Sequence, residues 1–228
     1  MSSDLSTQFR SLGERLGLAF TNPVGAVEGG LWGITLISES VGLVMTVIDA
    51  AKLDHNAPEN IQKIDQLRGE FVFSNVALSG TCSSILGWLH KTHVIHLGPW
   101  ESPVRAFGYS AYIFTSSWRA ADAASEFNCS AEKADNSQSS EDYHKARQQQ
   151  TASLLKLVTN VLYVAWSVLG LVALVTGSMA LLPIVDGLCI VAMAFWIGGA
   201  WLKLHISNEE KRLNGPETIP ASTFEQRV

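Results

Sequence analysis

Apolar residues gather in four long stretches of the chain, and polar segments separate these stretches. They cover residues 30–48, 72–89, 157–175 and 181–205. Each is close to or above the roughly 20 residues that a helix needs to cross the hydrocarbon core of a membrane. The sequence therefore predicts an all-α fold, a polytopic bundle of membrane helices with about four spans and a C-terminal helical hairpin.

The last two stretches predict a long helical hairpin over residues 141–213. The uncharged segment Thr176-Gly177-Ser178-Met179 lies between them and predicts the turn. Ser139 is followed three residues later by Asp142, a spacing typical of a capped helix start. The Asn-Gly-Pro triplet that opens residues 214–228 is expected to end the second helix, and that segment to form a disordered tail.

The first half of the chain divides less clearly. Residues 1–23 predict an amphipathic segment, which either lies on a membrane surface or packs on the bundle. Residues 24–121 form a first membrane region with two spans and an aromatic stretch at 106–118. Because that stretch is short and has an arginine at each end, an interfacial or re-entrant segment is the interpretation it favours. Residues 122–140 are expected to be a polar linker.

Composition agrees with a membrane protein and excludes some partners. Hydrophobic residues make up 47% of the chain and charged residues 16%, against a usual charged share of about 25%. The net charge of −5 gives no reason to expect nucleic acid. The three cysteines lack the close spacing of a zinc site or a disulfide framework, and the N-terminus lacks the pattern of a cleavable signal peptide.

Basic residues predict the orientation. With four spans, 13 of the 16 Lys and Arg residues would lie on the side of the two termini and residues 91–156. The positive-inside rule then makes that side cytosolic. A five-span arrangement, in which residues 106–118 also cross, would move the N-terminus outside. The sequon at Asn128 would require the opposite side if it were glycosylated, but such triplets often arise by chance.

Small residues recur at four-residue spacing in two of the spans. Gly25, Gly29 and Gly33 lead into the first span, and Ala194 and Gly198 form a weaker copy in the last. This glycine-zipper pattern allows a second backbone to approach closely, which favours helix packing in lipid. The approaching helix belongs either to a partner, such as a second copy in an oligomer, or to the same bundle, and packing within the bundle is favoured.

Glu39 is the main candidate for a functional polar group. A carboxylate inside a span is unfavourable unless it is paired or protonated, and by default it indicates a site. We expect Glu39 either to line an ion or proton path or to accept a hydrogen bond from Asn75 or Thr81 in the next span; a tilted first span is a plainer alternative. Asn160 in the third span is a weaker candidate of the same kind.

The sequence predicts neither a catalytic site nor a cofactor. It contains none of the nucleophile, zinc-protease, phosphate-loop or dinucleotide motifs. His90, His93 and His96 recur every three residues, but no cysteine or carboxylate lies between them to complete a metal site. We therefore interpret them as interfacial histidines and expect no metal.

The closing hairpin carries a resemblance to a known family. Two spans joined by a short uncharged turn, with polar ends on one side, follow a Ser/Thr-rich start, Met1-Ser2-Ser3-Asp4-Leu5-Ser6-Thr7. This resembles the bilobed hydrophobic pattern of chlamydial inclusion membrane proteins. The resemblance covers the hairpin and implies a secreted bacterial effector in a host vacuole membrane, with its termini in the host cytosol. The apolar stretches at 30–48 and 72–89 depart from the simplest form of that family.

These patterns predict an integral multi-pass membrane protein that acts as an anchor and a platform for protein interactions. Its partners are expected to be lipid and either a second copy or another membrane protein. The alternative is a channel or transporter-like subunit with Glu39 in a polar path. A soluble helical protein with an unusually apolar core is a third possibility.

Overall fold

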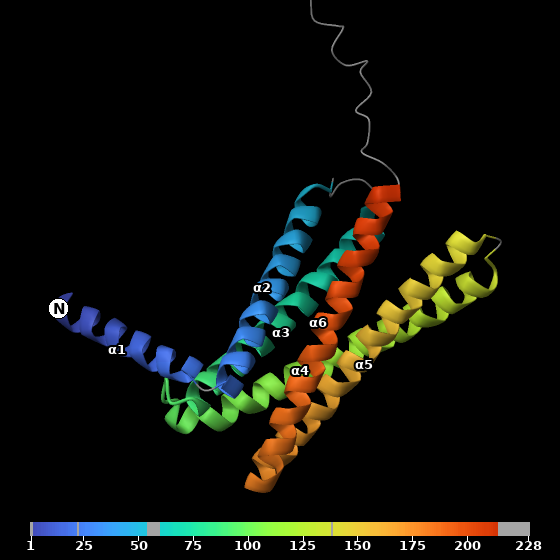
Figure 1. Ribbon diagram of the computed structural model, residues 1–228. Coiled ribbons are helices and arrows are strands. Elements are labelled where there is room, and N and C mark those ends of the chain that lie inside the picture. The colour runs from blue at the N-terminus through green and yellow to red at the C-terminus, as the bar shows by residue number, and fades with distance from the viewer. Residues whose placement is uncertain (1, 22, 54–59, 138, 214–228) are drawn as a thin grey trace, which may run out of the picture. The chain divides into compact units, whose positions relative to one another are not determined.

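The structure is a computed structural model that describes residues 2–21, 23–53, 60–137 and 139–213. Within these ranges the regular structure is helical, as the apolar pattern predicts. The helices, drawn in Figure 1, are α1 (Ser2–Thr21), α2 (Pro23–Ala51), α3 (Ile61–Lys91), η2 (Gly98–Trp100), α4 (Glu101–Asp135), α5 (Ser140–Thr176), η3 (Met179–Leu181) and α6 (Leu182–Leu213). The predicted tail, residues 214–228, lies outside the described residues.

Four of these helices are long and apolar enough to cross a membrane: α2, α3, α5 and the η3–α6 segment. They contain the four predicted spans. Only 17% of the most apolar window of α2 and 22% of that of the η3–α6 segment are buried within the protein. Apolar surface of this extent is typical of helices that face lipid. The fold class is therefore a polytopic helical membrane bundle.

The helix ends follow local chemistry in the sequence. Ser139 Oγ accepts a hydrogen bond from the Asp142 amide at 3.0 Å and donates one to the Asp142 carboxylate at 2.8 Å, which caps the start of α5. At the other end of α5, Gly177 has a φ of +64°. The amide of Ser178 donates to the carbonyl of Ala173, as in a Schellman motif. Both ends of this helix thus match the predicted cap and turn.

A short connection reverses the chain between α3 and α4. The amides of Val94 and Ile95 both donate to the carbonyl of Leu89, at 2.9 and 3.2 Å. His93 adopts a φ of +60° in this connection, and Val94 is buried. The helix that follows therefore returns antiparallel to α3.

The described chain forms two compact units, and α4, α5 and α6 each contribute residues to both. Unit 1 comprises residues 1–119 and 160–193, and unit 2 comprises residues 120–159 and 194–228. The sequence instead predicted segments that follow one another along the chain, each separated from the next by one boundary. Residues 122–140, expected as a linker, are helical as far as Asp135, and residues 106–118 are the middle of a continuous helix.

Unit 1 has an aromatic core. The ring of Trp166 lies 5.3 Å from that of Tyr112 and 5.8 Å from that of Trp32, and Tyr163 packs against both Tyr112 and Trp166. Trp32, Tyr112, Tyr163 and Trp166 are all at most 6% exposed. Tyr109 lies against Gly170, where an added Cβ would come within 2.4 Å of its ring. These rings fill the space between α2, α4 and α5.

In unit 1, α4 follows α3 closely over a long antiparallel contact. An added Cβ at Gly80 would lie 2.8 Å from Ala111, and one at Gly108 would lie 3.3 Å from Ser83. The hydroxyls of Thr81 and Tyr112 form a buried hydrogen bond of 2.8 Å. Small residues in α3 and α4 thus let the two helices approach closely.

Unit 2 joins the second half of α4 to the first half of α5 through small residues. Its buried side chains on these two helices include Ala123, Ser130, Ala134, Ala146, Ala152 and Ser153. Ion pairs flank the seam: Lys156 Nζ lies 2.8 Å from Glu126 and 3.5 Å from Asp122, and Arg147 lies 3.7 Å from Asp135. The two segments form a polar helical hairpin.

Candidate functional site

Glu39 forms a bidentate ion pair with Arg119 inside unit 1. Arg119 Nη1 donates to Oε1 at 2.8 Å and Nη2 donates to Oε2 at 3.0 Å. The Glu39 side chain is 13% exposed, and the Arg119 guanidinium also lies over the ring of Phe73 at 5.2 Å. Paired forks of this kind are among the stronger hydrogen-bonding arrangements in proteins. The carboxylate is therefore neutralised and held in place.

The partner expected for Glu39 was wrong. Asn75 donates to the carbonyl of Phe71 in its own helix at 2.8 Å, and Thr81 bonds with Tyr112. Arg119 was interpreted only as the far end of a short aromatic stretch. Because α4 continues through that arginine, its side chain lies on the face of the helix toward Glu39. Asn160 is buried in unit 1, at 6% exposure.

The glycine pattern divides between two environments. Gly25 is buried, and an added Cβ at Gly29 would come within 2.3 Å of the Trp88 ring. At Gly33 and Gly198 an added Cβ would meet nothing within 4 Å in the described part of the chain, and Ala194 is exposed. Gly29 is thus an internal packing residue, as favoured from the sequence.

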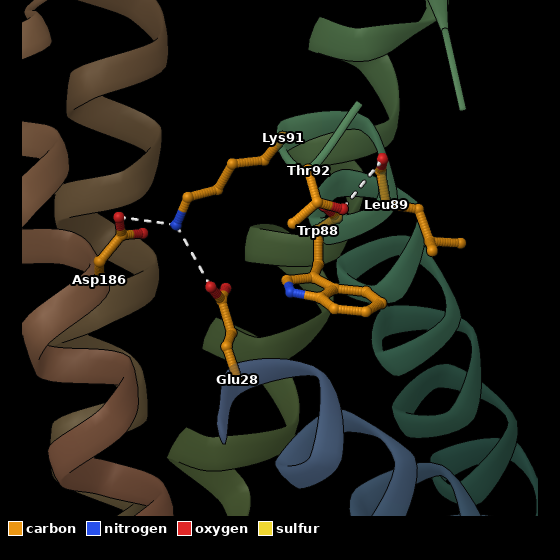
Figure 2. A network of polar contacts seen from close by, with 6 residues as sticks. All are labelled: Glu28, Trp88, Leu89, Lys91, Thr92 and Asp186. Atoms are coloured by element: carbon orange, nitrogen blue, oxygen red, sulfur yellow. Dashed lines mark hydrogen bonds and ion pairs between the residues drawn. The ribbon is translucent and has the colours of Figure 1, made fainter. Parts of the chain in front are cut away.

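A second charged cluster joins three helices at one end of unit 1. Lys91 Nζ at the end of α3 lies 2.7 Å from Asp186 in α6 and 3.2 Å from Glu28 in α2 (Figure 2). The carboxylate of Glu28 is 12% exposed, whereas Lys91 and Asp186 are each 38% exposed. The sequence offered only a weak signal for this cluster, because the three residues lie near the ends of separate apolar stretches.

Next to this cluster is a cavity of about 50 Å³. The five helices α2 to α6 all contribute to its lining, which includes Trp32, Trp88 and Arg105 besides the three charged residues. Figure 2 shows the Trp88 indole beside the ion pairs, with its ring nitrogen on the side nearer Glu28. The cavity is polar, although most of it is built from membrane helices.

Two of the three histidines, His90 and His96, make side-chain contacts in the connection between α3 and α4. His90 Nδ1 accepts a hydrogen bond from the Leu97 amide at 3.3 Å, and Nε2 lies 3.0 Å from Glu101. The ring of His96 lies 5.4 Å from that of His90. Over the described ranges no three His, Cys, Asp or Glu side chains are grouped so as to hold a metal ion.

No family model, curated protein or solved structure matches this chain. The resemblance to chlamydial inclusion membrane proteins therefore stays a prediction.

Proposed function

We propose that the protein is a membrane anchor and interaction platform, and that the polar hairpin of α4 and α5 is its docking element. One observation carries this proposal. Each helix of the hairpin is continuous with a segment of the membrane bundle, because α4 and α5 are single helices of 35 and 37 residues. A partner bound to the hairpin would thus be tied to the membrane without a flexible linker.

The hairpin itself has the properties of a preformed docking surface. Its small buried residues allow close packing but bury little apolar area, so the ion pairs of Lys156 and Arg147 help to fix the register. Unit 2 also has an open groove of about 660 Å³ with charged residues of both signs in its lining, among them Glu126, Lys133 and Lys203. This surface suits a polar protein segment.

The proposal includes a fifth crossing, made by the first half of α4. Phe107, Phe114 and Trp118 are more than half exposed, while Thr115 and Ser116 on the other faces are buried. Two polar side chains, Thr115 and Ser116, thus face the protein interior, and three large aromatic side chains face outward. Hydropathy alone misses such a helix because it averages over both faces.

Three further contacts support the fifth crossing. Residues 108–112 pair with residues 80–84 of α3, which lie inside a span, and Tyr109 packs on Gly170 inside another. Arg119 reaches Glu39, which lies near the middle of α2. A helix lying on the membrane surface would not make these contacts.

Five crossings separate the two termini. The N-terminus would then lie opposite the C-terminus, and the polar hairpin would share the side of the C-terminus. Eleven of the 16 Lys and Arg residues flank the spans on that side and four on the other, while Arg119 stays within its span. The positive-inside rule therefore makes the hairpin side cytosolic and the N-terminus external. This topology differs from the one that the resemblance to chlamydial inclusion membrane proteins implies, in which both termini lie in the host cytosol.

The channel hypothesis centred on Glu39 has weaker support. Both carboxylate oxygens are bound by Arg119, and aromatic rings fill the neighbouring interior of unit 1. An ion path there would require the pair to separate inside a low-dielectric region, which is unfavourable.

Photocrosslinking in the native membrane tests the platform. A photoreactive residue would replace Asn128 or Gln149, both exposed on the hairpin, and in the control Val172, which is exposed in a span. We expect discrete protein adducts from the two hairpin positions and lipid adducts from the control. Protein adducts at Val172 alone, or ion flux in liposomes that Glu39→Gln reduces, would contradict the proposal.

A further inference from the structure

The cavity beside Lys91 has an excess of hydrogen-bond donors. The indole nitrogens of Trp32 and Trp88 and the Nε of Arg105 are buried and have no partner among the residues that the structure describes. All three belong to side chains that line the cavity. Trp32 is 2% exposed and Trp88 is 5% exposed, so bulk water does not satisfy these groups. A buried donor without a partner is unfavourable, because it has lost its hydrogen bonds to water and gained none in return.

The unpaired groups define the chemistry of a ligand. Indole and guanidinium nitrogens can only donate hydrogen bonds. The second edge of Arg105 is occupied, because its Nη2 pairs with Glu101 at 3.1 Å. A group that satisfies the remaining donors must therefore offer lone pairs. A cation cannot do so, and Lys91 already occupies the carboxylates of Glu28 and Asp186.

The charge and the size of the cavity narrow the class of ligand that it can bind. The formal charges of the lining cancel, since Glu28 and Asp186 balance Lys91 and Arg105. The lining residues thus carry no net formal charge, and the Glu101 carboxylate that pairs with Arg105 Nη2 is not among them. Its volume of about 50 Å³ is equivalent to roughly three or four water molecules. This fits a halide or a one-carbon carboxylate and excludes nucleotides, sugars and lipid headgroups.

The site is also accessible from one side. Lys91 and Asp186 are each 38% exposed at the rim, whereas the indole nitrogens lie deeper. A small ion can thus enter past Lys91 and Asp186 and then meet the buried donors.

We propose that this cavity binds a small anion of the size of chloride or formate, held by the N–H groups of Trp32, Trp88 and Arg105. The inference concerns a site separate from the polar hairpin and does not depend on the proposed platform. It assigns a role to a group of donors that the packing of unit 1 leaves unsatisfied.

The test uses the full chain purified in detergent and measures the linewidth of the chlorine NMR signal. We expect protein-dependent broadening that sodium formate removes and sodium gluconate at equal ionic strength does not. Trp88→Phe keeps an aromatic side chain, although a smaller one, and loses the indole N–H, and we expect binding to weaken roughly tenfold or more. Trp32→Phe provides a second variant with the same expectation. Trp201→Phe is the matched control, because Trp201 is 68% exposed and does not line the cavity.

Two results would overturn the anion site. Broadening that gluconate displaces as well as formate does would indicate nonspecific screening. Equal chloride affinity in the wild type and in both Trp variants that fold would show that water alone satisfies these donors. Neither result concerns the protein adducts that we expect from the hairpin. The anion site and the proposed interaction platform can therefore be refuted independently of each other.

Discussion

Arg119 binds both carboxylate oxygens of Glu39 across 80 positions of the sequence, and the two side chains come from α4 and α2. This pair turns an isolated intramembrane charge into a link between two helices. An unpaired charge at this position would be strongly unfavourable in lipid. The arrangement therefore makes Glu39 part of a structural contact between α2 and α4.

Removing one partner of this pair should destabilise the protein. We expect Glu39→Gln and Arg119→Gln each to lower the free energy of unfolding by about 2–3 kcal/mol. This is at or below the low end of the roughly 3–5 kcal/mol seen for fully buried pairs, because Arg119 is 34% exposed. The double variant should lose less than the sum of the two. Reversible unfolding in mixed micelles measures all three, and additive losses would contradict a direct coupling.

The fifth crossing predicts that a maleimide reagent reaches the native Cys129 and a cysteine introduced at position 13 from opposite sides of the membrane. Cys129 is exposed on the hairpin and Gly13 is exposed on α1. In a background with Cys82→Ser and Cys189→Ala, we expect a membrane-impermeant maleimide to reach Cys129 and a Gly13→Cys cysteine in opposite vesicle orientations. A four-span arrangement instead labels both from one side. Permeabilised vesicles provide the control, because both cysteines should then react.

The apolar pattern was sufficient to predict the four spans, and short local motifs were sufficient to predict the closing turn and the cap of α5. These features depend on local residues: Ser139 and Asp142 are neighbours, and Gly177 alone supplies the left-handed conformation at the turn. The first half of α4 could not be predicted in this way. Tyr112 and Arg119 find their hydrogen-bond partners, Thr81 and Glu39, in other helices, and such partners cannot be deduced from one segment of the sequence.

The partners within the two charged clusters could not be predicted from the sequence either. Glu39 was recognisable as a candidate because a single carboxylate inside a span is rare, but the partner could not be deduced from spacing. Glu28, Lys91 and Asp186 each lie near a helix end, where charges usually meet solvent or headgroups. Only the arrangement of three helices brings them together.

Gly29 should be needed for stability but not for assembly. Because an added Cβ would come within 2.3 Å of the Trp88 ring, we expect Gly29→Ala to cost about 1–3 kcal/mol in the free energy of unfolding. Gly33→Ala is the matched control, since a Cβ there meets nothing within 4 Å over the described ranges. Unfolding in mixed micelles and crosslinked oligomer size are measured together. Loss of oligomers without loss of stability in Gly29→Ala would instead place Gly29 at an interface between copies.

The small-residue seam of the hairpin gives a final prediction about docking. Ala123 is fully buried between α4 and α5, so Ala123→Leu should force the two helices apart. Ala121→Leu adds the same side chain at an exposed position two residues away and should leave the hairpin intact. Spin-label distances between Asn128 and Gln149 report the separation of the helices. We expect this distance to increase in Ala123→Leu alone, together with a loss of protein adducts at both positions. If the hairpin opens and the adducts persist, docking does not depend on the packed hairpin, and its surface is not the platform.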